Sequence, residues 1–161
     1  MSVATIYTNE YNGGDEKMAK AVVIYSSIKG ATESISGLIA EGIRSGGHEM
    51  TVINSASIKT DSDLRGYDAY VFGSPTYHGE MMETMKNILF LAEKAKLEGK
   101  IGGSFGAFGW SGEATGRIYA TMKNIFNMDM VSGPLRLKSS SLQDGPQIAR
   151  AYGAEIAKKM G

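Results

Sequence analysis

The chain has 161 residues, enough for one domain with a sizeable core, and 42% of them are hydrophobic while 21% are charged. Lysine plus arginine number 17, as do aspartate plus glutamate, so the formal net charge of zero excludes a global field that recruits nucleic acid or an anionic membrane. Cysteine is absent, which excludes disulfides, thiolate metal sites and cysteine nucleophiles.

The sequence carries no signal for a membrane or for export. No apolar run approaches the roughly 18 residues of a membrane span, and the N-terminus lacks the basic-then-apolar pattern of a secretion signal. We therefore expect a cytoplasmic protein with no membrane insertion and no nucleic-acid partner.

Residues 1–19 differ in pattern from the rest of the chain. VATIY has the composition of a strand, and YNGGDEK that of a turn-rich connection. This N-terminal extension is interpreted as a loose tail, an extra edge strand or an arm that forms a homodimer. Residues 20–161 are predicted to form the folded domain.

After residue 20, strand-like and helix-like segments alternate. The predicted strands are residues 21–25, 49–54, 69–73, 101–109 and 135–137. The predicted helices are residues 31–44, 81–96, 113–126 and 147–160, whose apolar stripes include Ile125 and Ile148. This alternation predicts right-handed βαβ crossovers and a parallel sheet covered by helices on both faces.

Ligands of an open parallel sheet bind at the carboxyl ends of its strands, so the loops after the first, third and fourth strands matter most. The first loop, SSIKGAT, offers main-chain N–H groups, the hydroxyls of Ser27 and Thr32, and Gly30 for a tight turn. These features favour a bound phosphate over the alternative of an ordinary capped turn. Neither GxxxxGK[ST] nor GxGxxG is present, so the loop supports neither ATP nor a dinucleotide.

The second loop, GSPTYHGEMMETM, brings an aromatic residue to the same edge. Pro75 stiffens it, and Thr76, Tyr77 and His78 follow. Tyr77 is interpreted either as a ligand contact or as a rim residue over a helix end. Because the only other histidine, His48, is distant in sequence, His78 does not indicate a metal site.

The third loop, GAFGWSGEA, holds the only tryptophan of the chain, Trp110. Its glycine neighbours favour a flat ligand face or a partner surface over a core position. The loop does not match the GxSxG motif of serine hydrolases, because Glu113 stands where the motif has its last glycine. This argues against a hydrolase. One loop suited to a phosphate and two that supply aromatic rings predict a flat aromatic ligand with a single phosphate, the shape of FMN.

The chain resembles the flavodoxin family over roughly residues 20–160. YSSIKGATE is similar to the S/T-x-T-G-x-T phosphate loop, and GSPTYHG and AFGWSG are most similar to the flavodoxin module of the A-type (diiron) flavoproteins. GSPTYHGEMMETM is also similar to the tryptophan-repressor-binding-protein group of NAD(P)H:quinone reductases. The resemblance implies a short-chain α/β flavodoxin-like fold, a three-layer α/β/α sandwich around a five-stranded parallel sheet in the 2-1-3-4-5 order known for flavodoxins.

The same resemblance implies FMN as cofactor, no catalytic residue and no metal. The phosphate is expected at residues 27–32, and the isoalloxazine between Tyr77 and Trp110. The implied cofactor-binding residues are Ser27, Ile28, Lys29, Gly30, Ala31, Thr32, Pro75, Thr76, Tyr77, His78, Gly79, Ala107, Phe108, Gly109, Trp110 and Gly112.

Two residues depart from the family pattern. Lys29 stands where the family usually has threonine or serine; it is interpreted either as a phosphate contact or as a residue that points to solvent. His78 stands where flavodoxins often have a glycine whose peptide flips toward the reduced flavin. Because a positive φ is costly for histidine, we expect a less stabilised one-electron-reduced flavin.

Three functions remain open from the sequence. The first is an electron carrier that shuttles electrons between redox partner proteins, and the alternative is an NAD(P)H-dependent FMN quinone reductase. The neutral net charge favours the reductase, whereas the lack of a histidine after the fourth strand argues against it. The third is a flavin sensor or a module that serves a separate diiron protein.

Overall fold

The computed structural model describes residues 5–7, 19–109, 111–138 and 144–161. The main sheet is built from β1 (Thr5–Tyr7), β2 (Lys20–Tyr25), β3 (Glu49–Asn54), β4 (Ala69–Gly73), β7 (Ile101–Phe108), β8 (Asp129–Met130) and β9 (Leu135–Lys138). Their order is β1-β3-β2-β4-β7-β8, and β9 also pairs with β7.

The parallel part of the sheet confirms the predicted strand order. Strands β3, β2, β4, β7 and β9 lie side by side and parallel, which is the order 2-1-3-4-5 of the five predicted strands. The fifth strand has a second piece, because β8 pairs with the start of β7 and β9 with its end. At the other edge, β1 adds an antiparallel strand beside β3, so three residues of the N-terminal segment join the sheet.

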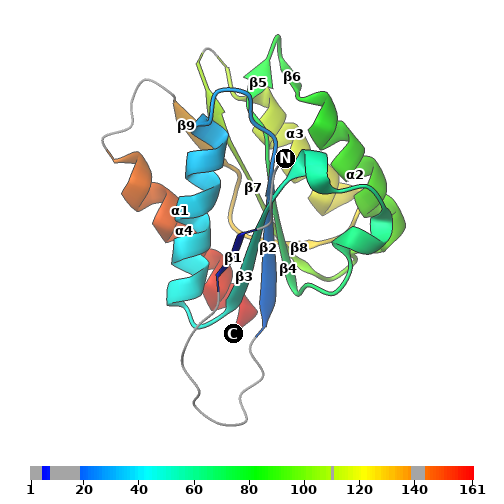
Figure 1. The fold of residues 1–161 in the computed structure, drawn as a ribbon, viewed down its shortest axis with the longest axis vertical. Coiled ribbons are helices and arrows are strands. Elements are labelled where there is room, and N and C mark those ends of the chain that lie inside the picture. The colour runs from blue at the N-terminus through cyan, green and yellow to red at the C-terminus, as the bar shows by residue number, and fades with distance from the viewer. Residues whose placement is uncertain (1–4, 8–18, 110, 139–143) are drawn as a thin grey trace.

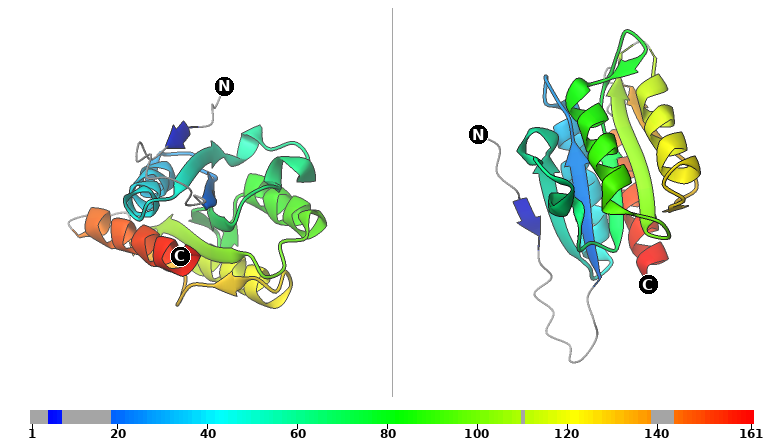
Figure 2. Two further views of the ribbon diagram at one scale, coloured as in Figure 1. Left: turned by 90° about the horizontal axis from the view of Figure 1, so that it is seen from below. Right: turned by 90° about the vertical axis from the view of Figure 1, so that its right-hand side faces the viewer.

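In the described part of the chain, four helices cover the sheet in two layers: α1 (Ala31–Ser45), α2 (Glu83–Ala95), α3 (Glu113–Asn124) and α4 (Gly145–Met160). Helices α1 and α4 cover one face, and α2 and α3 cover the other (Figures 1 and 2). Side chains alternate along β2, so that Val23 packs toward α1 and α4 while Val22 and Ile24 pack toward α2 and α3. Strands buried on both faces explain the continuous apolar run in this part of the sequence.

Some predicted boundaries and buried positions were wrong. The helix predicted from residue 81 begins at Glu83, because residues 76–81 form a short hairpin, β5 (Thr76–Tyr77) with β6 (Glu80–Met81). Ile125 and Ile148, placed in apolar stripes, are 60% and 45% exposed. Ile125 lies just beyond the end of α3, and α4 begins earlier than predicted, so Phe126 and Ala149 take the buried positions.

Candidate cofactor site

Three loops meet at the carboxyl edge of the sheet, at the top of Figure 1. Tyr25, Gly73 and Phe105 lie in register on neighbouring strands, so β2 and β4 end at the same level, while β7 continues to Phe108. Between these loops is a hollow of about 60 Å³, lined by Ser27, Ile28, Lys29, Ala31, Thr32, Pro75, Tyr77 and Ala107. All of these lining residues were predicted from the sequence.

The loop after β2 leaves the start of α1 available to an anion. Gly30 precedes the helix with a φ of 85°, a value that favours glycine, and its N–H donates to Ser27 Oγ at 2.9 Å. Among the described residues, no side chain caps the first turn of α1. The main-chain N–H groups of that turn are therefore free for a phosphate, and the helix dipole favours negative charge there.

The loop after β4 is a tight hairpin rather than an irregular extended segment. Tyr77 pairs with Glu80 across a two-residue turn in which His78 and Gly79 have φ values of 52° and 75°. Two positive φ values are typical of a type I′ turn. The hairpin geometry thus imposes on His78 the positive φ that is costly for histidine, and the weaker stabilisation of the one-electron-reduced flavin stays a prediction. Tyr77, 38% exposed, stands beside this turn and lines the hollow.

Hydrogen bonds and ion pairs tie the hairpin to both neighbouring helices. Ser74 Oγ accepts the N–H of Met82 at 3.0 Å, next to the start of α2. Thr76 Oγ1 accepts the N–H of Ala114 at 3.1 Å, in the first turn of α3. The Glu80 carboxylate pairs with Lys86 and Arg117, one from each helix, and these cations, Lys86 foremost, lower the pKa of Glu80.

The loop after β7 is held by an arginine that the sequence analysis missed. Arg136 Nε donates to the carbonyl oxygen of Gly112 at 3.0 Å, beside the start of α3. The alternating pattern LRLK of β9 places Leu135 and Leu137 in the core and Arg136 outside. That alternation was readable from the sequence, but only the pairing of Arg136 with Gly106 on β7 brings it near the site.

The other predicted residues that the structure describes do not line the hollow. Gly30 shapes the first loop, and Thr76 turns its hydroxyl to α3. His78 and Gly79 form the hairpin tip, while Phe108, Gly109 and Gly112 lie along the third loop. Trp110 lies outside the described residues. No cluster of three metal-ligating side chains is present in the described part of the chain.

A family model described as a flavodoxin domain matches residues 22–137. The chain belongs to the flavodoxin domain family. FMN is the cofactor of this family, at the point of the sheet where the strand order reverses. The hollow fits the phosphate of FMN, because an uncapped helix start, the hydroxyl-bearing Ser27, Thr32 and Tyr77, and Lys29 line it, and no described lining residue is acidic.

Relatives and solved structures agree with this assignment. Rubredoxin-oxygen oxidoreductase of Megalodesulfovibrio gigas is 29% identical over 149 residues, which are 86% of this chain and 37% of that protein. NAD(P)H dehydrogenase (quinone) of Archaeoglobus fulgidus is 30% identical over 116 residues, 55% of this chain and 61% of the relative. A solved flavodoxin from the domain Archaea, 30% identical, matches with a TM-score of 0.81 over 87% of this chain and 97% of its own.

The chain spans between 18% and 61% of the length of four curated relatives that it matches. In the described residues, no helix has the length and apolar character needed to cross a membrane.

Proposed function

We propose that this flavodoxin-domain protein is an FMN-dependent electron carrier that passes electrons between redox partner proteins in the cytoplasm. The observation that carries the proposal is how little of the site is enclosed. The hollow of about 60 Å³ is far smaller than the ~300–1,000 Å³ of small-molecule pockets. Because it has room for a phosphate but not for the ring, we infer that the ring of FMN lies along the exposed loops, where a partner protein can approach it.

Each part of the site has a role in this proposal. The N–H groups at the start of α1, with Ser27, Thr32 and Lys29, bind the phosphate. Tyr77 covers one side of the ring, and the ion pairs of Glu80 hold the hairpin that carries Tyr77. FMN itself supplies the one- and two-electron chemistry, and the protein supplies binding, orientation and electrostatics.

A second candidate function is an NAD(P)H-dependent quinone reductase. It is favoured by the 30% identity to a relative named NAD(P)H dehydrogenase (quinone) and by the net charge of zero. A homodimer formed through the N-terminal extension stays a prediction from the sequence.

An anaerobic reduction experiment separates the two functions. The FMN-loaded protein is mixed first with NADPH and then with NADH while the visible absorption of the flavin is recorded. The carrier proposal expects no bleaching until dithionite is added. Prompt bleaching by either nucleotide would overturn it in favour of the reductase.

Lys29→Ala tests the phosphate site. Because Lys29 lines the hollow, the substitution is expected to lower the affinity for FMN by about ten-fold, the effect of losing one charge-assisted contact. The affinity for riboflavin, which has no phosphate, should stay nearly unchanged. Fluorescence titrations with both ligands measure this, and Lys100→Ala, at the amino edge of β7, is the matched control. Equal losses for FMN and riboflavin would remove Lys29 from the phosphate site.

A further inference from the structure

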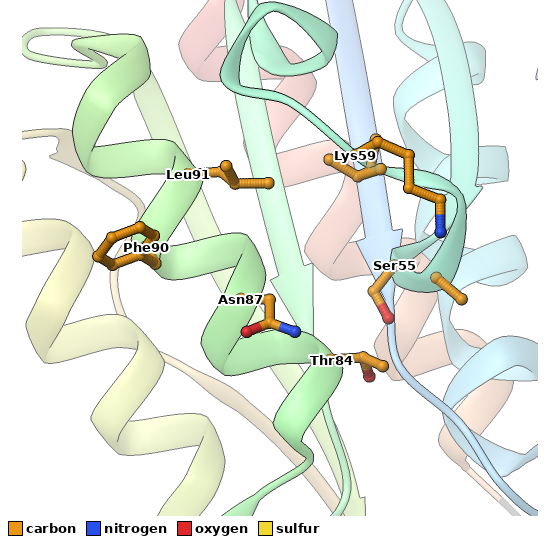
Figure 3. A pocket seen from close by; sticks show the side chains of 8 residues that line it. Ser55, Lys59, Thr84, Asn87, Phe90 and Leu91 are labelled. Carbon is orange, nitrogen blue, oxygen red and sulfur yellow. The ribbon is translucent and has the colours of Figure 1, made fainter.

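A second, larger cavity lies at the same edge of the sheet. It is a groove of about 410 Å³ between α2 and the short 3₁₀ turn η1 (Ser55–Ser57), which follows β3 (Figure 3). Its volume falls within the ~300–1,000 Å³ of small-molecule sites. The groove is lined by Ser55, Ala56, Ile58, Lys59, Thr84, Asn87, Phe90 and Leu91, none of which belongs to the cofactor site.

A chain of three hydroxyl groups, of which those of Ser26 and Ser55 are buried, reaches the groove at Ser55 and Thr84. Ser26 Oγ lies 2.6 Å from Ser55 Oγ and 2.8 Å from Thr84 Oγ1. Each hydroxyl has one proton to donate, so two of the three protons serve these two hydrogen bonds and one is left over. Among the described residues, none of the three side chains has a further hydrogen-bond acceptor. Since Ser55 and Thr84 both line the groove, the spare proton is available there.

The side chains of the other two polar lining residues, Lys59 and Asn87, have no partner among the described residues. Neither the Lys59 ammonium nor the Asn87 amide forms a hydrogen bond or an ion pair with any described residue. Figure 3 shows the Asn87 amide extending from α2 toward the Ser55 hydroxyl, and the Lys59 ammonium on the opposite side, beside η1. No described lining residue is acidic, so this part of the groove presents a cation and hydrogen-bond donors to a ligand.

The remaining walls are apolar. Ile58 and Leu91 line the groove, and Phe90 at its rim is 63% exposed. Lys94 Nζ lies 4.7 Å from the centre of the Phe90 ring and adds a second cation near the rim. A ligand that satisfies both parts of the groove needs an anionic head and an apolar body, because a simple anion such as phosphate would leave the apolar walls unused.

We propose that this groove is a binding site for a small organic carboxylate with an apolar body. The carboxylate accepts hydrogen bonds from Lys59, Asn87 and the hydroxyl chain, and the body packs on Ile58 and Leu91. The site is separate from the cofactor hollow, since the two share no lining residue. Binding there is therefore testable whether or not the electron-carrier proposal holds.

The test is a titration of the FMN-loaded full chain with benzoate, followed by the amide signals in ¹H–¹⁵N NMR spectra. Benzyl alcohol serves as the neutral analogue and inorganic phosphate as the anion without an apolar body. With benzoate we expect saturable shifts of the amide signals of Ser55, Lys59, Thr84 and Asn87. The affinities for benzyl alcohol and phosphate should be at least about ten-fold lower, because the first lacks a charge-assisted hydrogen bond and the second lacks the apolar contact.

Lys59→Met keeps the length of the side chain and removes its charge. It is expected to weaken benzoate by about ten-fold or more, whereas the matched Lys100→Met variant should bind like the wild type. The flavin absorption spectrum reports that both variants remain folded. No saturable shift with benzoate, equal binding of benzoate and benzyl alcohol, or an unchanged affinity in Lys59→Met would overturn the proposal.

Discussion

Gly106→Ala tests how the core of the sheet supports the cofactor site. A Cβ atom at Gly106 would lie 2.3 Å from the Ser74 carbonyl oxygen and 2.4 Å from Thr115 Oγ1. Neither neighbour can retreat easily, because both residues are buried and the Ser74 N–H is hydrogen-bonded to Phe105 of β7. Either β7 or the chain at Ser74 must therefore move.

The magnitude follows from this crowding. Overpacking a core typically lowers the free energy of unfolding by ~1–3 kcal/mol. Because two close contacts form at once, we expect a loss of about 3 kcal/mol for this variant. For a chain of this size, that lowers Tm by roughly 6–12 °C and raises the unfolding equilibrium constant by roughly 100-fold. Ser74 precedes Pro75, which lines the hollow, so the affinity for FMN should fall as well.

Urea unfolding of the FMN-free protein, followed by circular dichroism, measures the stability, and fluorescence titration measures FMN binding. Gly37→Ala in α1 is the matched control, because a Cβ there has no neighbour within 4 Å. Alanine in a helix interior should stabilise the protein by about 0.5–1 kcal/mol, the opposite sign. A Gly106→Ala variant within about 0.5 kcal/mol of the wild type, with unchanged FMN affinity, would refute the argument, since that is the range of neutral surface substitutions.

Three further predictions concern the loops around the hollow. Arg136→Ala removes the hydrogen bond to Gly112 and a positive charge near the site, so FMN should bind about 3- to 10-fold more weakly and the flavin midpoint potential should become more negative; unchanged values in fluorescence and potentiometric titrations would contradict this. His78→Gly removes the cost of a left-handed conformation at a residue with a Cβ atom, so the free energy of unfolding in urea should rise by up to about 1 kcal/mol. A loss of stability would show that the contacts of the histidine side chain outweigh this cost. Glu80 has a lowered pKa, chiefly because of Lys86. The stabilisation of the hairpin by its ion pairs is therefore present above the ordinary pKa of 4.5 and is lost as the pH falls through the lowered value. As the pH is lowered, the affinity for FMN should therefore fall more in the wild type than in Glu80→Gln. Parallel pH profiles of the two proteins would show that the ion pairs of Glu80 do not support FMN binding.

Much of the fold and the residues that line the hollow were readable from the sequence. Apolar periodicity distinguishes strands from helices, because the apolar residues that face the core recur at different spacings in the two kinds of element. Because strands and helices alternate strictly along the chain, few topologies other than a parallel sheet remain. The loop at residues 26–32 was recognisable because its features are local: a glycine before a helix, hydroxyls beside it and no competing cap. Residues of this kind act within a few positions of one another, so their order in the chain carries the information.

Only the tertiary structure decided the features that join distant segments. The hairpin pairs Tyr77 with Glu80 and forces His78 into a positive φ, although histidine by itself disfavours one. Arg136 meets Gly112 across 24 positions, and Ser26 meets Thr84 across 58. A sequence pattern shows which groups can donate or accept, but which of them meet depends on strand register and helix packing. These are set by the burial of the whole core.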